Sequence, residues 1–336
     1  MRICVVGAGA IGGFLAIRLA NAGHEVSIIL RGANLEAAQR DGMTLIEEDG
    51  REIRVKPALV TSRIADAGAQ DLVILGMKAH QVPPIAAELP ALFGDATRVA
   101  TMQNGIPWWY FHKLPGPWQG TPVRSVDPDG ETEKHIGVDR VIGSVVYPAS
   151  EVIRPAVIKV IEGNRFTLGE LDGSDNPSIR AVSDAFKAAG FKAPISSDIR
   201  SEIWLKLWGN LSFNPISALT HATLEDICLF DPTRELAAGM MREAQAIGEK
   251  LGVQFKVSLD KRIAGAQAVG QHKTSMLQDV EMGRPLEIQA LVGSVLELGA
   301  ITQTPTPTIA TVHALVSLLA RQLQKAGGAL QIAKPA

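Results

Sequence analysis

The sequence predicts an α/β fold with a doubly wound, mostly parallel sheet, followed by an all-helical second domain. In the first half of the chain, short apolar runs alternate with helix-like segments. From Asp198 onward, apolar residues recur at helical spacing with little strand character. The length of 336 residues exceeds what one core commonly holds, so two domains are expected, 1–196 and 197–327.

The chain opens with a predicted strand, a glycine-rich turn and a helix. Residues 3–6 form an apolar run typical of a buried parallel strand, and a helical pattern extends up to Gly23. Between them lies a G-x-G-x-x-G motif, made of Gly7, Ala8, Gly9, Ala10, Ile11 and Gly12. In this motif the first glycine makes the turn, the second leaves room for a pyrophosphate, and the third allows close packing. The motif predicts a dinucleotide-binding Rossmann domain; the alternative is a glycine cluster that only packs a helix against a strand.

The end of the second predicted strand, residues 24–30, indicates which dinucleotide binds. An NAD site usually has Asp or Glu about 20 residues beyond the glycines. This chain has Arg31 there, 19 residues after Gly12. A guanidinium can hold a 2′-phosphate, so NADP(H) is favoured over NAD. The alternative is that Arg31 is a solvated residue of a βα loop.

The remaining elements of the first half follow the same alternation. We predict strands at 53–60, 71–78, 98–105 and 141–147, a hairpin at 157–171 turning at 163–164, and a helix at 176–190. Lys78 and Asn104 then lie at the carboxyl ends of two strands, where open α/β sheets bind ligands. Residues 106–140 are rich in Pro, Gly and Trp and are predicted to leave the sheet.

The second half is predicted to contain helices near 199–220, 232–252, 258–270, 285–300 and 306–324. Asp198 is a plausible N-cap of the first helix, and the tail after Gly327 is expected to fray. Lys206, Asn210 and Asn214 are spaced by four residues, so their side chains share one helix face. This stripe is either a solvated face or a set in which the lysine protonates a carbonyl oxygen and the amides orient a substrate.

A second polar cluster spans residues 273–288. Thr274 and Ser275 are donors at a predicted helix start, a suitable place for a carboxylate. Glu287 follows Pro285 in the first turn of the next predicted helix. Spacing alone does not distinguish these functional roles from helix capping.

Composition excludes several classes of protein. With 46% apolar and 20% charged residues, a net charge of −2 and no basic run, neither a nucleic-acid partner nor a membrane is expected. Two distant cysteines offer no disulfide framework or zinc spacing, so no metal and a cytoplasmic location are expected. The oligomeric state cannot be read; the apolar C-terminal helices are compatible with a homodimer.

Six motifs together carry a family resemblance: GAGAIGG, Arg31, MKAHQV, QNG, KLWGNLSFNP and SMLQDVEMGRPLEI. Over nearly its full length the chain resembles the ketopantoate reductase (2-dehydropantoate 2-reductase) family. The resemblance implies a Rossmann domain and a helical C-terminal domain like that of 6-phosphogluconate dehydrogenase, with the active site between them. It also implies that Lys206 is the general acid. The implied substrate residues are Asn104, Asn210, Asn214 and Ser275, and the implied further cofactor residues are Lys78, Asn104, Ala149 and Glu287.

The predicted function is NADPH-dependent reduction of 2-dehydropantoate to pantoate, for pantothenate and coenzyme A synthesis. Three departures leave the substrate open: the Trp-rich segment, the residues Tyr147, Pro148 and Ala149 at a sheet end near the expected cleft, and Leu224 at a position where the family's site can supply an amide. The alternatives are a related enzyme that reduces another small 2-oxo acid or oxidises the corresponding alcohol, and a non-catalytic NADPH-binding sensor or scaffold. A sensor would need the glycine-rich turn and Arg31, but not Lys206.

Overall fold

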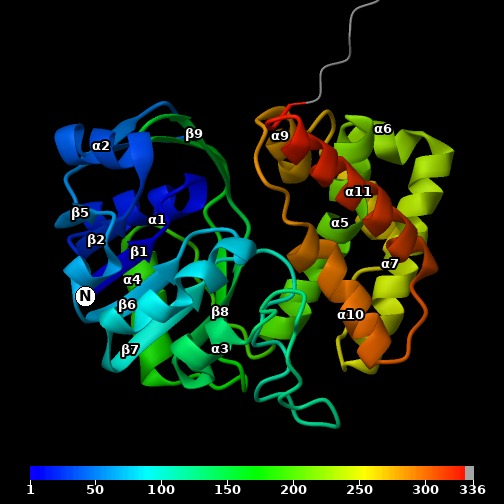
Figure 1. Ribbon diagram of the computed structural model, residues 1–336, viewed down its shortest axis with the longest axis horizontal. Coiled ribbons are helices and arrows are strands. Elements are labelled where there is room, and N and C mark those ends of the chain that lie inside the picture. Colours follow the sequence, from blue (N-terminus) through cyan, green and yellow to red (C-terminus); the bar gives the residue numbers. More distant parts are fainter. Residues whose placement is uncertain (330–336) are drawn as a thin grey trace, which may run out of the picture. The chain divides into compact units, whose positions relative to one another are not determined.

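A computed structural model describes residues 1–329 of the chain, so part of the tail after Gly327 lies outside the described residues (Figure 1). The chain divides into two compact units. The first comprises Met1–Val123 and Asp127–Glu202, and the second comprises Arg124–Val126 and the chain from Ile203 onward. The later division falls inside one long helix, a few residues after the predicted boundary at 196.

The first unit is built on a seven-stranded sheet with the order β11-β8-β7-β6-β1-β2-β5. Its strands are β1 (Arg2–Val6), β2 (Glu25–Ile29), β5 (Leu59–Thr61), β6 (Gln70–Leu75), β7 (Phe93–Thr101), β8 (Val141–Val146) and β11 (Phe166–Gly169). All neighbours pair in parallel except β11, which is antiparallel to β8. Residues 3–6 of β1 are buried, as expected for a central strand covered on both faces. The prediction of a doubly wound, mostly parallel sheet is confirmed.

A second, four-stranded sheet with the order β4-β3-β10-β9 was not predicted. Its strands are β3 (Met43–Ile46), β4 (Glu52–Val55), β9 (Ala149–Arg154) and β10 (Val157–Glu162). The predicted hairpin at 157–171 is wrong, because β10 pairs with β9 and β3, whereas β11 pairs with β8 in the large sheet. The predicted strand at 53–60 is also wrong. It is split between β4 and β5, in different sheets, around Pro57, which cannot donate to a strand ladder.

Helices and short 3₁₀ segments surround these sheets. They are α1 (Ala10–Asn21), α2 (Gly32–Asp41), α3 (Glu131–Ile136), α4 (Pro177–Ala188), η1 (Ile64–Ala67), η2 (Ala79–Gln81), η3 (Pro83–Leu92) and η4 (Val138–Arg140). Helix α1 packs on β1 and β2 of the large sheet and on all four strands of the small one. A Cβ at Gly13 would lie 2.8 Å from the Ile158 side chain, so this glycine allows α1 to approach β10 closely.

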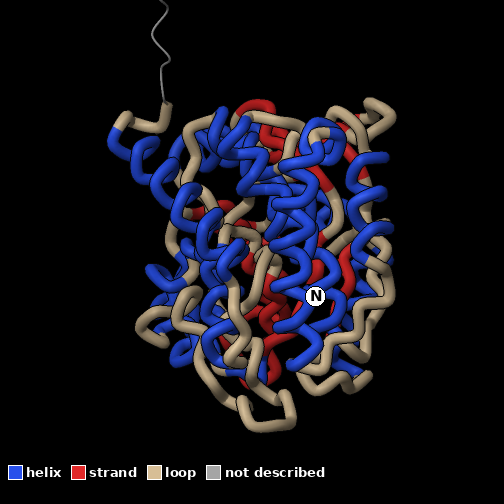
Figure 2. The backbone as a smooth tube through the Cα atoms, turned by 90° about the vertical axis from the view of Figure 1, so that its right-hand side faces the viewer, coloured by secondary structure: helices blue, strands red, loops and turns tan. Residues whose placement is uncertain are grey.

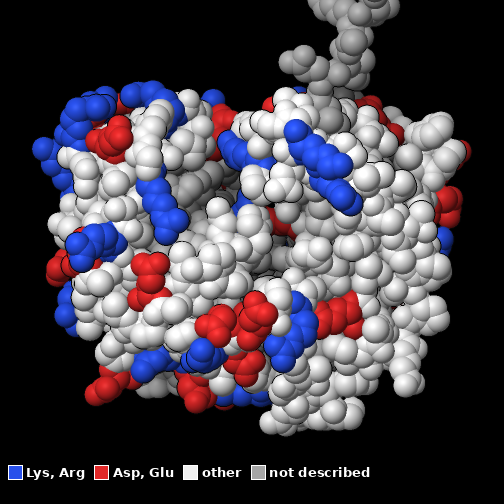
Figure 3. Space-filling model, in the orientation of Figure 1, with Lys and Arg blue, Asp and Glu red and all other residues white. Residues whose placement is uncertain are grey.

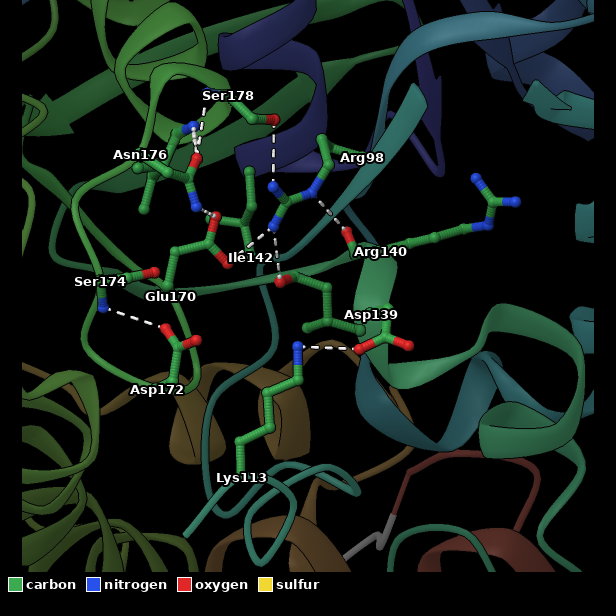
Figure 4. A network of polar contacts seen from close by, with 12 residues as sticks. Arg98, Lys113, Asp139, Arg140, Ile142, Glu170, Asp172, Ser174, Asn176 and Ser178 are labelled. Carbon is green, nitrogen blue, oxygen red and sulfur yellow. Dashed lines mark hydrogen bonds and ion pairs between the residues drawn. The ribbon is translucent and has the colours of Figure 1, made fainter. Parts of the chain in front are cut away.

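A partly buried arginine, Arg98, joins β7, β8 and α4 (Figure 4). The Arg98 guanidinium donates to the carbonyl oxygens of Arg140 (3.1 Å) and Val141 (3.1 Å) at the start of β8. It also donates to the Ser178 hydroxyl (3.0 Å) of α4 and forms an ion pair with Glu170 (2.8 Å). The excursion at 106–140 returns to the sheet beside this network, which joins β7 to the start of β8.

The described part of the second unit contains helices, turns and loops but no strand. Figure 2 shows the helices of the chain in blue and its strands in red. The helices from residue 199 onward are α5 (Ile199–Thr220), α6 (Leu224–Leu229), α7 (Asp231–Lys250), α8 (Leu259–Ala268), α9 (Ser275–Glu281), α10 (Ser294–Ile301) and α11 (Pro307–Lys325). The predicted helix at 285–300 starts at Ile288 and winds as a π-helix, η5 (Gln289–Gly293), before α10. The short helix α6 was not predicted. The short helix α9 lies outside the predicted helix ranges, but its first residue agrees with the helix start predicted at Thr274 and Ser275.

Candidate functional site

The glycine-rich turn has the local geometry that dinucleotide binding requires. Gly7 adopts φ +85°, a left-handed conformation that side chains disfavour. A Cβ at Gly12 would lie 2.1 Å from the Gly7 carbonyl oxygen and 3.3 Å from the Gly76 Cα, so α1 packs tightly against the ends of β1 and β6. A Cβ at Gly9, in contrast, would have no atom of the chain within 4 Å. The surface above Gly9 is therefore open to a ligand.

The start of α1 can bind an anion. Gly9 is its N-cap and provides no side-chain hydrogen bond to the helix, and Ala8, Ala10 and Ile11 likewise carry no polar side chain. The backbone N–H groups of a first turn point along the helix axis and carry its positive dipole end. With open space above Gly9, this turn fits a pyrophosphate group.

Arg31 lies at the junction between β2 and α2, where it is the N-cap residue of α2. Its side chain is exposed. On the face drawn in Figure 3, lysine and arginine side chains gather over the part of the first unit where Figure 1 places α2. An exposed guanidinium there can reach a phosphate through paired N–H groups.

The carboxyl ends of β6 and β7 are tied together by Gln103. Its side-chain amide donates to the carbonyl oxygens of Leu75 (2.7 Å) and Met77 (3.0 Å). Lys78 and Asn104 are the next residues of these two loops, so both sit at one edge of the sheet. Sequence reasoning missed Gln103; its place between a strand end and Asn104 was the available signal.

Ala149 has a different setting. It is the first residue of β9, in the small sheet, and pairs with Glu162 of β10. It lies three positions after the end of β8 and is partly buried. Its link to the large sheet is this short connection from β8.

Helix α5 carries the predicted polar stripe on an otherwise apolar helix. The Asp198 carboxylate accepts from the Ser201 backbone N–H (3.0 Å), as expected for an N-cap. Trp204 and Trp208 are fully buried, and the Trp208 indole donates to the Met241 carbonyl oxygen of α7 (2.7 Å). Anchoring this apolar face fixes the direction of the stripe formed by Lys206, Asn210 and Asn214. Lys206 and Asn210 are partly buried, and Asn214 is buried.

The environment of Lys206 changes its acidity. Burial lowers the pKa of the Lys206 ammonium from 10.5 to about 8, and the Glu287 carboxylate opposes this by favouring the charged form. Both residues belong to the second unit. A lysine with a pKa near 8 can both hold and release a proton close to neutral pH, as a general acid must.

Ser275 is not the cap of its helix. Thr274 is the N-cap of α9, and its hydroxyl accepts from the Leu277 backbone N–H (3.3 Å). Ser275, the first residue of α9, instead lies with its hydroxyl 3.4 Å from the Asn214 side-chain nitrogen. The structure thus brings together two predicted substrate residues from separate segments of the sequence.

Glu287 lies one residue before Ile288, where the next helix begins, so the prediction that it stands in the first helical turn is wrong. Its backbone carbonyl accepts from Leu291 N (3.3 Å). The π-helix over Gln289–Gly293 follows directly, and such bulges are frequent at functional sites. Its carboxylate favours the charged form of Lys206 and so opposes the lowering of that lysine's pKa by burial.

Residues 1–329 contain neither a candidate metal site nor a membrane-spanning helix. There is no group of three His, Cys, Asp or Glu side chains that could hold a metal ion. No helix of this part of the chain is long and apolar enough to cross a membrane.

Comparison with known proteins identifies relatives of this chain. Residues 3–109 match the family model described as Ketopantoate reductase PanE/ApbA, and residues 198–320 match the model of its C-terminal part. A 2-dehydropantoate 2-reductase from Mesorhizobium japonicum is 54% identical over 321 residues, covering 95% of this chain and 98% of that protein.

Solved structures agree. A candidate ketopantoate reductase from Ralstonia solanacearum MolK2 has 40% identity and a TM-score of 0.91, covering 96% of this chain and 98% of that one. D-mandelate dehydrogenase, in a ternary structure with NADH and anilino(oxo)acetate, shares the fold at 20% identity and a TM-score of 0.81, covering 96% and 100%. Fold and relatives define an oxidoreductase. The chain belongs to the ketopantoate reductase family.

Proposed function

We propose that this protein reduces 2-dehydropantoate to pantoate with NADPH, in the cytoplasm, as a step of pantothenate and coenzyme A synthesis. The observation that carries the proposal is Lys206, whose pKa near 8 is set by burial and by Glu287, on one helix face with Asn210 and Asn214. The 54% identical relative named 2-dehydropantoate 2-reductase supports the substrate.

The cofactor is proposed to bind the first unit. The open surface above Gly9 and the first turn of α1 would hold the pyrophosphate, and Arg31 would hold the 2′-phosphate. Lys78, Asn104, Ala149 and Glu287 are proposed as further contacts. When bound, the nicotinamide supplies a hydride to the carbonyl carbon of the substrate.

Lys206 would complete the reduction. As the ketone carbon becomes tetrahedral, its oxygen gains negative charge, which an ammonium directed at it stabilises. Lys206 Nζ then transfers its proton to this oxygen and is left neutral. Burial makes loss of that proton more favourable by lowering the pKa, and the Glu287 carboxylate favours the charged lysine before the reaction.

The remaining predicted residues would orient the substrate. The Ser275 hydroxyl and the Asn214 amide, which converge, suit the substrate carboxylate. Asn210, one turn from Lys206, and Asn104 can donate to the keto and hydroxyl oxygens. Because the substrate is held in its reactive geometry on binding, the entropic cost of orienting it no longer adds to the activation barrier.

An assay of cofactor oxidation tests the proposal. Purified protein is mixed with NADPH and, separately, with 2-dehydropantoate and a panel of other small 2-oxo acids. The proposal expects the highest kcat/KM with 2-dehydropantoate, and pantoate as the product by mass spectrometry. No NADPH oxidation with any member of the panel would refute it.

A reductase of a different 2-oxo acid is a second candidate. Leu224, the first residue of α6, offers no amide, and the Trp-rich excursion packs Trp109, Tyr110 and Phe111 into the core of the first unit. Either difference can alter the space available to a substrate side chain. A higher kcat/KM for another member of the panel would establish this candidate.

A further inference from the structure

The polar stripe of α5 extends one turn further toward the helix start, to Glu202. Glu202 precedes Lys206 by four residues, the same spacing that separates Lys206, Asn210 and Asn214. Its carboxylate accepts a hydrogen bond from the Tyr147 hydroxyl (3.0 Å) and lies 3.8 Å from the Arg165 guanidinium. An acidic side chain on the candidate catalytic face is thus bound to a tyrosine.

Tyr147 stands at the ligand-binding edge of the large sheet. It directly follows β8, and Asn104 lies three residues after the end of β7, the neighbouring strand. Its backbone N–H donates to the Arg165 carbonyl oxygen (3.1 Å), which continues the pairing of β8 with β11. Gly7, Lys78, Asn104 and Tyr147 therefore follow the carboxyl ends of four adjacent strands, β1, β6, β7 and β8.

The Tyr147 ring is held in place and yet remains accessible. Its hydroxyl is bound by Glu202, and the Arg165 guanidinium lies 5.2 Å from the ring centroid. The residue nevertheless keeps 38% of its surface exposed. A ring whose polar tip is bound within the protein presents an apolar surface of fixed position. Such a surface can exclude a large ligand without binding a small one tightly.

We propose that Tyr147 is a specificity-determining residue: its ring limits the size of the 2-oxo acid side chain, and Glu202 and Arg165 position the ring. This inference rests on the proposed function and concerns recognition of the side chain of the 2-oxo acid. It predicts selection of a compact aliphatic 2-oxo acid over a bulky aryl one. Glu202 is a positioning residue here, because it acts through Tyr147.

The test compares two substrates across a set of variants. The kcat/KM is measured with NADPH for 2-dehydropantoate and for phenylglyoxylate, an aryl 2-oxo acid. Tyr147→Ala removes the ring that limits substrate size. We expect the ratio of the two kcat/KM values to shift at least about tenfold toward phenylglyoxylate, because about tenfold is the lower end of the discrimination that one methylene group provides. The dissociation constant for NADPH, measured by fluorescence, should not change. Ile161→Ala, which truncates a similarly exposed apolar side chain in the small sheet, is the control and should leave the ratio unchanged.

The positioning role has its own readout. Tyr147→Phe keeps the ring and Glu202→Gln keeps the shape of the acid, so each weakens the same hydrogen bond. Each should shift the ratio by a similar, smaller factor, and the double variant should add nothing further. A strictly additive double variant would overturn the role of Glu202.

The remaining outcomes separate the two proposals. An unchanged ratio in a folded Tyr147→Ala protein, or a change confined to NADPH affinity, would overturn the specificity role. Should that variant fail to fold, an unchanged ratio in Tyr147→Phe and Glu202→Gln would overturn it in the same way. Failure of the wild-type protein to reduce either acid would instead reject the proposed function, and this inference with it.

Discussion

The Asn214 side-chain nitrogen lies 3.4 Å from the Ser275 hydroxyl oxygen, which brings the stripe of α5 beside the start of α9. The distance is long for a hydrogen bond, so the contact between the two groups is weak. Thr274, not Ser275, caps α9. The two polar groups are therefore well placed to share one ligand.

Ser275→Ala should raise KM for the 2-oxo acid about tenfold to 150-fold and change kcat little. The reason is that a contact to a carboxylate, present in both ground and transition states, contributes about 1.5–3 kcal/mol to binding. Steady-state kinetics at saturating NADPH measures this. Thr274→Ala is the matched control: it should lower stability by about 1 kcal/mol through loss of the cap and leave KM unchanged. A fall in kcat alone for Ser275→Ala would argue against carboxylate binding.

Lys206→Ala should lower kcat by about 10²–10⁴-fold, the usual contribution of a general acid, while NADPH still binds. Turnover and a fluorescence titration with NADPH measure the two effects. Lys273→Ala is the control, because that lysine is exposed and paired with Glu281 (2.7 Å). Near-normal turnover of Lys206→Ala on its best substrate would contradict the role of Lys206 as general acid.

The rate of reduction should fall as pH rises through about 8, because Lys206 must be protonated to donate and its pKa is lowered to about 8. Glu287 favours the charged lysine, so Glu287→Gln should move this falling limb to lower pH. The measurement is kcat/KM against pH, which reports the free enzyme. Glu281→Gln should leave the profile in place. A falling limb that moves to higher pH in Glu287→Gln would contradict the assigned role of the carboxylate.

Arg31→Ala should lower kcat/KM with NADPH by about tenfold to 150-fold, since a charge-assisted contact is worth about 1.5–3 kcal/mol. The value with NADH, which lacks the 2′-phosphate, should hardly change. Arg40→Ala is a control in the same helix, because its guanidinium is already paired with Asp41 (2.7 Å). Equal use of NADPH and NADH by the wild-type protein would exclude the assignment of NADP(H).

Substitutions at Gly12 and at Gly9 should have different effects. Gly12→Ala places a Cβ 2.1 Å from the Gly7 carbonyl oxygen, so the free energy of unfolding should fall by about 1–3 kcal/mol. Gly9→Val meets no atom of the chain at its Cβ, so thermal stability should be kept while NADPH affinity is lost. Thermal denaturation and NADPH titration of both variants check this. Unchanged NADPH affinity in Gly9→Val would mean that the turn does not contact the phosphates.

The sequence by itself determined the features that depend on near neighbours in the chain. The turn at Gly7 and the shared face of Lys206, Asn210 and Asn214 follow from backbone geometry over a few residues. The cap at Asp198 is equally local, and its side chain binds Ser201 N as predicted. Alternating apolar runs were enough for the parallel sheet, since buried central strands read as continuous apolar segments.

Only the tertiary structure decided which distant segments meet. Residues 157–162 could pair with either flanking strand, and packing on α1 placed them in the second sheet, beside β9 and β3. The pKa of Lys206 likewise depends on burial and on Glu287, 81 positions away. The approach of Asn214 to Ser275 and of Tyr147 to Glu202 has the same origin. Local patterns set which side chains share a face, but a side chain's neighbours, and hence its charge and reactivity, are set by long-range packing.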